Sequence, residues 1–320
     1  MRKLKSTTTN DSRENDIATS TANLNALYAR QLSLFEIRGV LLSELSDVIC
    51  RDKGVSFDEL SSYYDSIFTQ NNTPSRDDTS KRFGGLSTLD KIDFCRSVSK
   101  AKQINQELSQ ALFGESERIS SEAKGRLAYM QNHYTDAAYL IFSKSVPSLR
   151  ASYFSSFQAV CEEVYTGACE YCILPIENSS DGKLMSFYSM IDKYELKISS
   201  VCTVRHSDGQ SFTKFALLNK SFLPSGIFNA PAAYLNKRSI EIRVSQTSVN
   251  DSPLDNILLA ANACDLRIHR VDSLPLSYNE DLLGYYIVLG INNVDFKTFL
   301  TYVAFEYPQC YIVGIYSNAN

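Results

Sequence analysis

An apolar stretch that ends in small polar residues constrains this chain most. Residues Cys172 to Ile176 are apolar apart from their single proline, and Glu177, Asn178 and Ser179 follow at once, before a helical pattern that starts at Lys183. A strand that stops at polar residues just before a helix places hydrogen-bond donors at a helix N-terminus, where an anion can sit. The stretch therefore predicts a binding site. The alternative is that Asn-Ser-Ser-Asp-Gly serves only as a turn and a helix cap.

The residues around this stretch alternate between strand and helix patterns. The predicted strands are 126–130, 151–155, 171–176, 196–204 and 213–219, and the predicted helices are 134–144, 156–166 and 183–194. This order predicts an open, mostly parallel sheet with helices on its faces. Ligands of such sheets bind beyond the carboxyl ends of the strands, which is where Glu177 falls.

The same residues resemble the prephenate dehydratase family. Leu174-Pro-Ile-Glu-Asn-Ser-Ser-Asp-Gly182 is similar to the family's Pro-Ile-Glu-Asn-Ser signature, and Thr213-Lys-Phe215 is similar to its Thr-Arg-Phe motif. The flanking elements that also resemble the family are Arg126–Tyr129, Tyr134–Lys144, Phe157–Gly167 and Leu196–Ile198. The resemblance covers residues 125–220 and implies a periplasmic-binding-protein-like α/β lobe.

The resemblance implies an activity and a set of site residues. These enzymes remove water and carbon dioxide from prephenate, which gives phenylpyruvate for phenylalanine synthesis. By this match Thr213 is the catalytic proton donor, with Glu177 and Asn178 as the other catalytic residues. The substrate-binding residues by the same match are Ser179, Lys214 and Phe215. No cofactor is expected.

The chain departs from the family in one large respect. Prephenate dehydratases have two lobes, and the second is inserted between the strands that match 196–204 and 213–219. Only Arg205 to Phe212 separate these strands here, so a whole lobe is missing, and His206-Ser-Asp-Gly-Gln210 has the composition of a hairpin turn. In addition, Lys214 replaces the family's arginine, which removes planar bidentate carboxylate binding. A dehydratase completed by a neighbouring subunit and a non-catalytic, ligand-sensing homologue both remain open, and the missing wall favours impaired catalysis.

A second α/β pattern follows a predicted linker over 221–238. Its strands are predicted at 239–245, 267–275, 284–291 and 309–317, and its helices at 253–264 and 294–306. This β-α-β-β-α-β order is ferredoxin-like, and its position after a dehydratase-like domain resembles an ACT domain spanning 239–320. The residues at the places of the family's phenylalanine-binding motifs are Ser252, Leu254 and Asp272, and they match these motifs poorly. Dimerisation through the sheet is the alternative role.

The first third of the chain is predicted to be helical. Residues 1–20 are polar and are expected to form a disordered tail. From Leu24 apolar residues recur every three to four positions to about Gly54, a second helix begins after Ser56, and a third runs from Ser87 to Gly114. The module at 21–115 resembles fused chorismate mutases in its position, but its arginines do not match their spacing, which leaves a scaffold or dimerisation role.

Composition limits the remaining classes. With 32 basic and 36 acidic residues, the chain gives no reason to expect nucleic acid. The pair Cys169 and Cys172 has no second pair or nearby histidine to complete a zinc site, so Cys172 is interpreted as a buried structural thiol. No signal peptide or membrane-spanning run occurs, so a cytoplasmic location is expected. The expected partners are a prephenate-like aromatic dicarboxylate or an aromatic amino acid, together with further copies of the chain as a homo-oligomer.

Overall fold

The computed structural model describes most of the 320-residue chain. The described residues are 7–51, 55–69, 88–101, 104–113, 124–146, 148–220, 235, 237–248, 253–276, 279–291 and 295–320. Residues 70–87, most of the predicted linker at 221–238 and Ser252 lie outside these residues.

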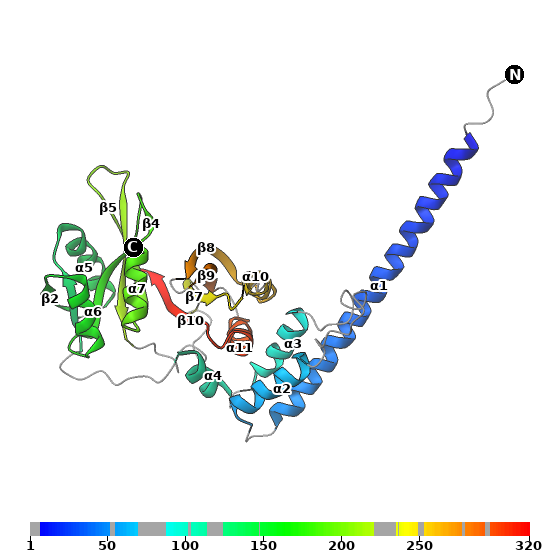
Figure 1. Ribbon diagram of the computed structural model, residues 1–320, viewed down its shortest axis with the longest axis horizontal. Helices are drawn as coiled ribbons and strands as arrows, with labels where there is room; N and C mark the ends of the chain where they lie inside the picture. The colour runs from blue at the N-terminus through cyan, green and yellow to red at the C-terminus, as the bar shows by residue number, and fades with distance from the viewer. Residues whose placement is uncertain are drawn as a thin grey trace.

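The described part of the N-terminal third contains four helices. They are α1 (Thr7–Arg51), α2 (Phe57–Thr69), α3 (Thr88–Val98) and α4 (Ile104–Phe113). The helix predicted after Ser56 is confirmed, because Glu59 accepts a hydrogen bond from the Ser56 N–H at 3.0 Å and donates its own N–H to the Ser56 hydroxyl. The N-terminal part of helix α1 projects away from the rest of the molecule, and its C-terminal part lies beside α3 (Figure 1).

Two expectations for these helices were wrong. Helix α1 begins at Thr7, so part of the expected disordered tail is helical. Polar residues can extend a helix that already exists, because propagation lacks the cost of nucleation. The third predicted helix is two helices, which separate after Val98 at a turn where Ala101 N–H bonds Val98 O and the Ser99 hydroxyl bonds Arg96 O.

The middle of the chain forms the predicted α/β lobe. Its elements are β1 (Arg126–Met130), α5 (His133–Ser145), β2 (Arg150–Phe154), α6 (Phe157–Tyr165), β3 (Tyr171–Asn178), β4 (Gly182–Lys183), α7 (Met185–Lys193), β5 (Lys197–Arg205) and β6 (Phe212–Asn219). Strands β1, β2 and β3 are parallel, and β6 runs antiparallel between β3 and β5. The expectation of a mostly parallel sheet was therefore wrong, because the β3–β4 turn and the β5–β6 hairpin add antiparallel pairs. Helix α5 packs on one face of this sheet with Phe142, while α6 and α7 pack on the other with Val160 and Ile191.

The C-terminal elements form the predicted ferredoxin-like unit. They are β7 (Arg238–Ser245), α10 (Pro253–Ala263), β8 (Arg267–Leu276), β9 (Asn279–Ile291), α11 (Phe296–Glu306) and β10 (Tyr311–Asn318). The strand order β10-β7-β9-β8 with antiparallel pairs is the ferredoxin-like arrangement. Side chains of β7 alternate, so that Ile240 and Ile242 face α10 and α11 while Glu241 faces away from them.

The lobe and the ferredoxin-like unit share one continuous sheet. Among the described residues the order is β2-β1-β3-β6-β5-β10-β7-β9-β8, with β4 added beside β3, which makes ten strands. The link is a parallel pairing of β5 with β10, and Figure 1 shows β10 between the two parts. Gly314 allows the close approach, because a Cβ there would lie 2.6 Å from the Ile198 carbonyl oxygen.

The N-terminal helices cover the helices of the ferredoxin-like unit. One apolar core contains Leu60 of α2, Phe94 of α3 and Phe299 of α11. Phe57 stacks on Phe305 with ring centroids 5.2 Å apart, and Lys91 forms an ion pair with Glu306 at 2.6 Å. The N-terminal helices and the helices of the ferredoxin-like unit therefore pack together as one layer. No described helix combines the length and the hydropathy that crossing a bilayer requires.

Candidate functional site

The polar residues after β3 form a hairpin turn instead of a helix N-terminus. The Asn178 side-chain oxygen accepts hydrogen bonds from Ser180 N–H at 3.0 Å and Asp181 N–H at 2.6 Å. Strand β4 then pairs antiparallel with the end of β3, with Glu177 opposite Lys183. Helix α7 starts only after Leu184, which provides no side-chain cap. The expected anion site at a helix N-terminus is therefore wrong, and the turn chemistry considered as the alternative describes Asn178.

Ser179 also has a local structural role. Its backbone N–H donates to the Phe212 carbonyl at 3.0 Å, and its hydroxyl accepts from the Phe212 N–H at 3.2 Å. These two contacts tie the β3–β4 turn to the start of β6. The resemblance assigned Ser179 to substrate binding, but these two hydrogen bonds already engage its N–H and its hydroxyl.

Strand register separates the two principal catalytic candidates. Glu177 lies opposite Lys214 and Asn178 lies opposite Thr213, after a bulge between Pro175 and Glu177. Paired residues share a face and successive residues alternate. The side chain of Thr213 is therefore on the α5 face of the sheet and that of Glu177 is on the α7 face. The structure does not bring Glu177 and Thr213 into one site.

The α5 face holds Thr213 at the end of the β5–β6 hairpin. The predicted hairpin is confirmed, since β5 and β6 pair antiparallel and His206 N–H bonds the Ser211 carbonyl. His206 Nε2 lies 2.9 Å from the Thr213 hydroxyl, and the His206 ring stacks on Tyr134 with centroids 4.3 Å apart. This spacing allows a proton to pass between imidazole and hydroxyl.

Phe215 lies deeper on the same face. It is buried in the core beside α5, with 3% of its surface exposed. Phe215 was expected to contact the substrate, but in the structure it packs in the core beside α5. From the sequence, His206 is only the first residue of a predicted hairpin turn. The short turn is also the signal that could have placed His206 near Thr213, because it sets the two residues at the ends of paired strands.

The α7 face holds Glu177 within a cluster of charges that spans the two parts of the sheet. Glu177 forms ion pairs with Arg270 at 2.8 Å and with Lys214 at 3.8 Å. Arg270 also pairs with Asp272 at 2.9 Å, and Asp272 lies 3.3 Å from Lys183. The carboxylate of Glu177 is thus held by cations of the chain itself.

Glu241 forms the buried end of this cluster. It is 1% exposed, and its carboxylate bonds Lys183 Nζ at 2.6 Å. The hydroxyls of Tyr316 and Tyr188 donate to its other oxygen at 3.1 and 3.4 Å. Burial raises the pKa of both tyrosines, and the neighbouring Glu241 charge raises it further. The sequence did not indicate Glu241, because one glutamate in an alternating strand is typical of a solvent-facing position.

Of the three candidate regulatory residues, two can be placed. Leu254 is partly buried and packs against the core shared by α10 and the N-terminal helices. Asp272 is engaged by Arg270 and Lys183, as described above. Neither faces a cavity that the structure describes.

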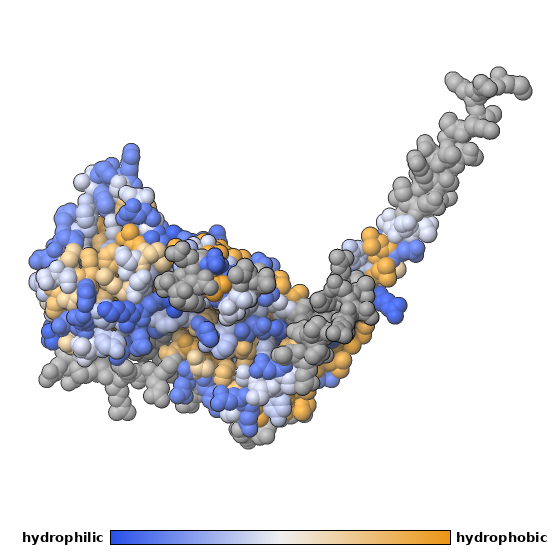
Figure 2. Space-filling view, in the orientation of Figure 1, coloured by the Kyte–Doolittle hydropathy of each residue, from blue (hydrophilic) through white to orange (hydrophobic). Residues whose placement is uncertain are grey.

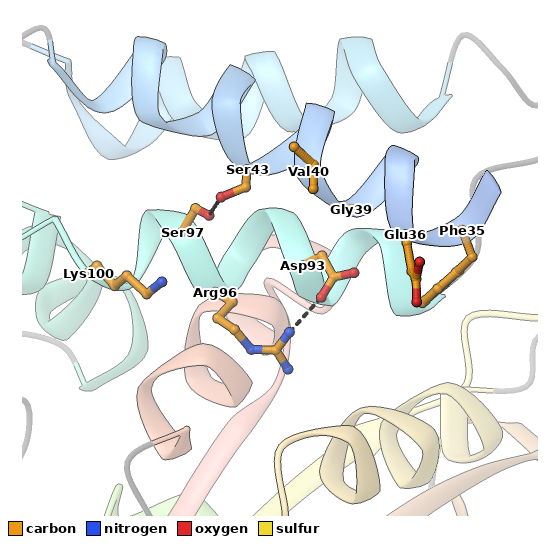
Figure 3. Close-up of a pocket in the computed structure, with 9 residues that line it drawn as sticks. All are labelled: Phe35, Glu36, Gly39, Val40, Ser43, Asp93, Arg96, Ser97 and Lys100. Atoms are coloured by element: carbon orange, nitrogen blue, oxygen red, sulfur yellow. Dashed lines mark hydrogen bonds and ion pairs between the residues drawn. The ribbon is translucent and has the colours of Figure 1, made fainter. Parts of the chain in front are cut away.

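A hollow of about 410 Å³ lies away from both faces, between α1 and α3. Figure 3 shows its polar lining, where Ser43 contacts Ser97 and Arg96 contacts Asp93 at 2.5 Å. Arg96 also lies 3.6 Å from Asp295. The lining also carries Lys100 and Glu36, so its two basic side chains are balanced by acidic ones, and the hollow does not resemble a site for a dicarboxylate. Cys172 is fully buried, as predicted, and the described residues hold no group of metal ligands.

Comparison with known proteins agrees with the order of elements in the lobe. The model of the prephenate dehydratase family matches residues 131–207, from the end of β1 to the β5–β6 turn. Over this segment the chain is prephenate dehydratase-like. No curated protein matches the chain.

Solved structures of the same class are also similar to the chain. The prephenate dehydratase from Streptococcus mutans has 14% identity and a TM-score of 0.48, with 60% of this chain and 98% of that one covered. The enzyme from Arthrobacter aurescens in complex with L-Phe has 13% identity and a TM-score of 0.46, with 61% and 90% covered. The enzyme from Staphylococcus aureus has 10% identity and a TM-score of 0.44, with 60% and 100% covered.

Proposed function

We propose that this chain is a prephenate dehydratase-like protein that does not itself dehydrate prephenate and instead acts as a non-catalytic regulatory module. The observation that carries the proposal is the direct β5–β6 hairpin, whose turn occupies the place of a second lobe. Dehydration of a dicarboxylate needs donors on both sides of the substrate and a cleft that excludes water. One lobe supplies one side only.

The separation of the candidate residues supports the same conclusion. Thr213 and Glu177 point to opposite faces of the sheet, so one substrate cannot contact both side chains. Glu177 is held by Arg270 and Lys214, and its use on a ligand would break an ion pair at 2.8 Å. Loss of preorganised groups removes several kcal/mol of barrier lowering, on the order of 3 kcal/mol for one oxyanion donor.

The shared sheet supports the interpretation as a regulatory module and argues against an enzyme whose lobe moves on a hinge. Strand β10 extends the lobe through β5, and Lys183 and Glu241 join the two parts across a buried contact. Movement of the lobe alone would break this sheet. An aromatic acid that binds either part would therefore stabilise both, which is the behaviour of a sensor.

The first test is an assay with prephenate at neutral pH, in which phenylpyruvate is measured for the wild type and for Thr213→Ala. The expected result is no phenylpyruvate above a protein-free blank for either protein. Turnover by the wild type that Thr213→Ala abolishes would refute the proposal. It would establish the enzyme, with the Thr213–His206 contact as its proton path.

The second test measures thermal unfolding with L-phenylalanine, L-tyrosine or prephenate, and with L-leucine as the control ligand. A ligand at 100 times its Kd stabilises the folded state by about 2.7 kcal/mol. A rise in Tm with an aromatic acid and none with leucine supports the sensor. Equal Tm values for all ligands would reject sensing of these compounds.

A further inference from the structure

Helix α1 carries an apolar stripe along the side that faces away from the molecule. Its residues are Leu27, Leu34, Ile37, Leu41, Leu45 and Val48, which we call the outer stripe. At 100° per residue these six positions fall within about 80° of the helix circumference. Exposed fractions of 61% for Leu27, 55% for Leu34, 58% for Leu41 and 62% for Val48 show that nothing in the described chain covers them. Figure 2 shows apolar colour along the outer edge of this helix.

The other side of α1 accounts for its attachment to the molecule. Leu42 and Ser46 are buried, Ser43 bonds Ser97 at 2.8 Å, and Arg38 pairs with the buried Asp90 of α3. The outer stripe therefore does not serve the contact with α3. A large apolar surface of this kind on one protein marks an interaction site.

The spacing of the outer stripe fits another helix. Leu27, Leu34, Leu41 and Val48 recur at every seventh residue, which is the repeat of a coiled-coil seam about 30 Å long. Ile37, Val40, Leu41 and Glu44 also line a surface hollow of about 250 Å³. These positions are i, i+3, i+4 and i+7, which together form the hole that receives a side chain from a partner helix.

We propose that the outer stripe pairs antiparallel with the outer stripe of a second copy of this chain. The four heptad positions are symmetric about the point between Ile37 and Arg38. A two-fold axis there places Leu34 against Leu41 of the second copy and Leu27 against Val48 of the second copy, which is the isologous contact of a C2 dimer.

Charge selects this orientation. The antiparallel pairing brings Arg30 beside Glu44 of the second copy, and it does so twice because of the two-fold axis. Parallel helices in register would instead place Arg30 at the level of Arg30 of the second copy, and Glu44 at the level of Glu44 of the second copy. Like charges there oppose pairing.

The charges near the stripe also disfavour a membrane as its partner. Between Leu27 and Val48 the helix has three acidic residues and two basic ones. Amphipathic helices that bind anionic lipid are rich in Lys and Arg on the polar face. A second copy of the chain is the occupant that fits both the heptads and the charges.

The experiment measures mass by light scattering at about 50 μM protein, which is well above a Kd of about 1 μM. The wild type is expected to have twice the mass of one chain, and Leu34→Glu and Leu41→Glu are expected to be monomers. Leu32→Glu is the matched control, because Leu32 is 62% exposed on the same helix but lies outside the stripe, and it stays a dimer. Circular dichroism and Tm establish that each variant is folded.

Orientation is tested by exchanging charges. Arg30→Glu and Glu44→Arg each replace two attractions with two repulsions and are expected to raise the dimer Kd about 30-fold. The double variant Arg30→Glu with Glu44→Arg restores the wild-type Kd only if the helices are antiparallel. No restoration would overturn the arrangement.

Three results would overturn the dimer itself. They are a monomeric wild type at this concentration, a dimer that survives Leu34→Glu, and loss of the dimer in Leu32→Glu. A monomeric wild type that sediments with vesicles of anionic phospholipid would assign the stripe to a membrane surface, against the proposal.

Discussion

Replacing Glu241 by Gln tests whether the buried charge cluster joins the two parts of the sheet. The variant keeps the side-chain volume and removes one negative charge that is 1% exposed. Lys183 loses the carboxylate at 2.6 Å, while Tyr316 and Tyr188 lose a charged acceptor. A buried charge that keeps no partner costs about 3–5 kcal/mol, so about 5 kcal/mol is the upper limit.

The remaining contact of Lys183 lowers this cost. Asp272 stays 3.3 Å from its ammonium group, so the charge is not left alone. Glutamine also still accepts one tyrosine hydrogen bond. We therefore expect Glu241→Gln to lower the free energy of unfolding by about 2–3 kcal/mol.

The assay is urea unfolding at pH 7. The chain contains no tryptophan, so far-ultraviolet circular dichroism follows the transition. Glu162→Gln is the control, because this exposed glutamate contacts Gln158 and Tyr194 at the surface, and its variant is expected to keep the wild-type midpoint. Lys183→Met and the double variant complete a mutant cycle with Glu241→Gln, with an expected coupling of about 1.5–3 kcal/mol.

Two results would refute this reasoning. One is a loss below about 0.5 kcal/mol for Glu241→Gln, which is the range of an ordinary surface substitution. The other is strict additivity of the Glu241 and Lys183 variants, which would mean that their contact at 2.6 Å contributes nothing to the folded state.

Two further predictions concern the link between β5 and β10. Gly314→Ala is expected to lower stability by about 1–3 kcal/mol, because its Cβ would meet the Ile198 backbone at 2.6 Å; an unchanged urea midpoint would contradict the pairing. Burial lowers the pKa of Lys197 to about 7, against about 10.4 in the unfolded chain. Between these values the unfolded state binds more protons, so stability rises with pH, and the stabilising effect expected of Lys197→Met is largest below pH 7 and shrinks toward pH 10. Unfolding midpoints of both proteins from pH 6 to 10 check this, and a pH-independent difference would contradict it.

Local patterns predicted the lobe and the ferredoxin-like unit well, because each element there has a clear hydrophobic period. The β5–β6 hairpin followed from Asp208-Gly209, where Gly209 adopts a φ of 70° and the Asp208 carboxylate accepts the N–H groups of Gln210 and Ser211. The pairing of β5 with β10 had no such signal. Its partners Ile198 and Gly314 lie far apart in the sequence, and their contact depends on the folded arrangement of both parts.

The site was harder to predict, because it depends on register. The order Glu177-Asn178 already implies opposite faces for two neighbouring strand residues. Which of them meets Thr213 depends on the bulge after Pro175, and a bulge has no reliable signature in one sequence. Residues that are neighbours in a sequence motif can therefore have side chains on opposite faces of the sheet.

The ferredoxin-like unit is covered on both faces by other parts of the chain. On one face Glu306 of α11 accepts from Lys91 and from the Tyr64 hydroxyl at 2.7 Å. On the other face Tyr286 of β9 packs edge-on against Tyr188 of α7, with centroids 5.3 Å apart. An isolated ferredoxin-like unit would expose both apolar faces to water, so its stability depends on the helices before it and the lobe beside it. A ligand that shifts this unit must therefore also shift α3 and α7, which are the elements that connect it to the outer stripe of α1 and to the dehydratase-like sheet.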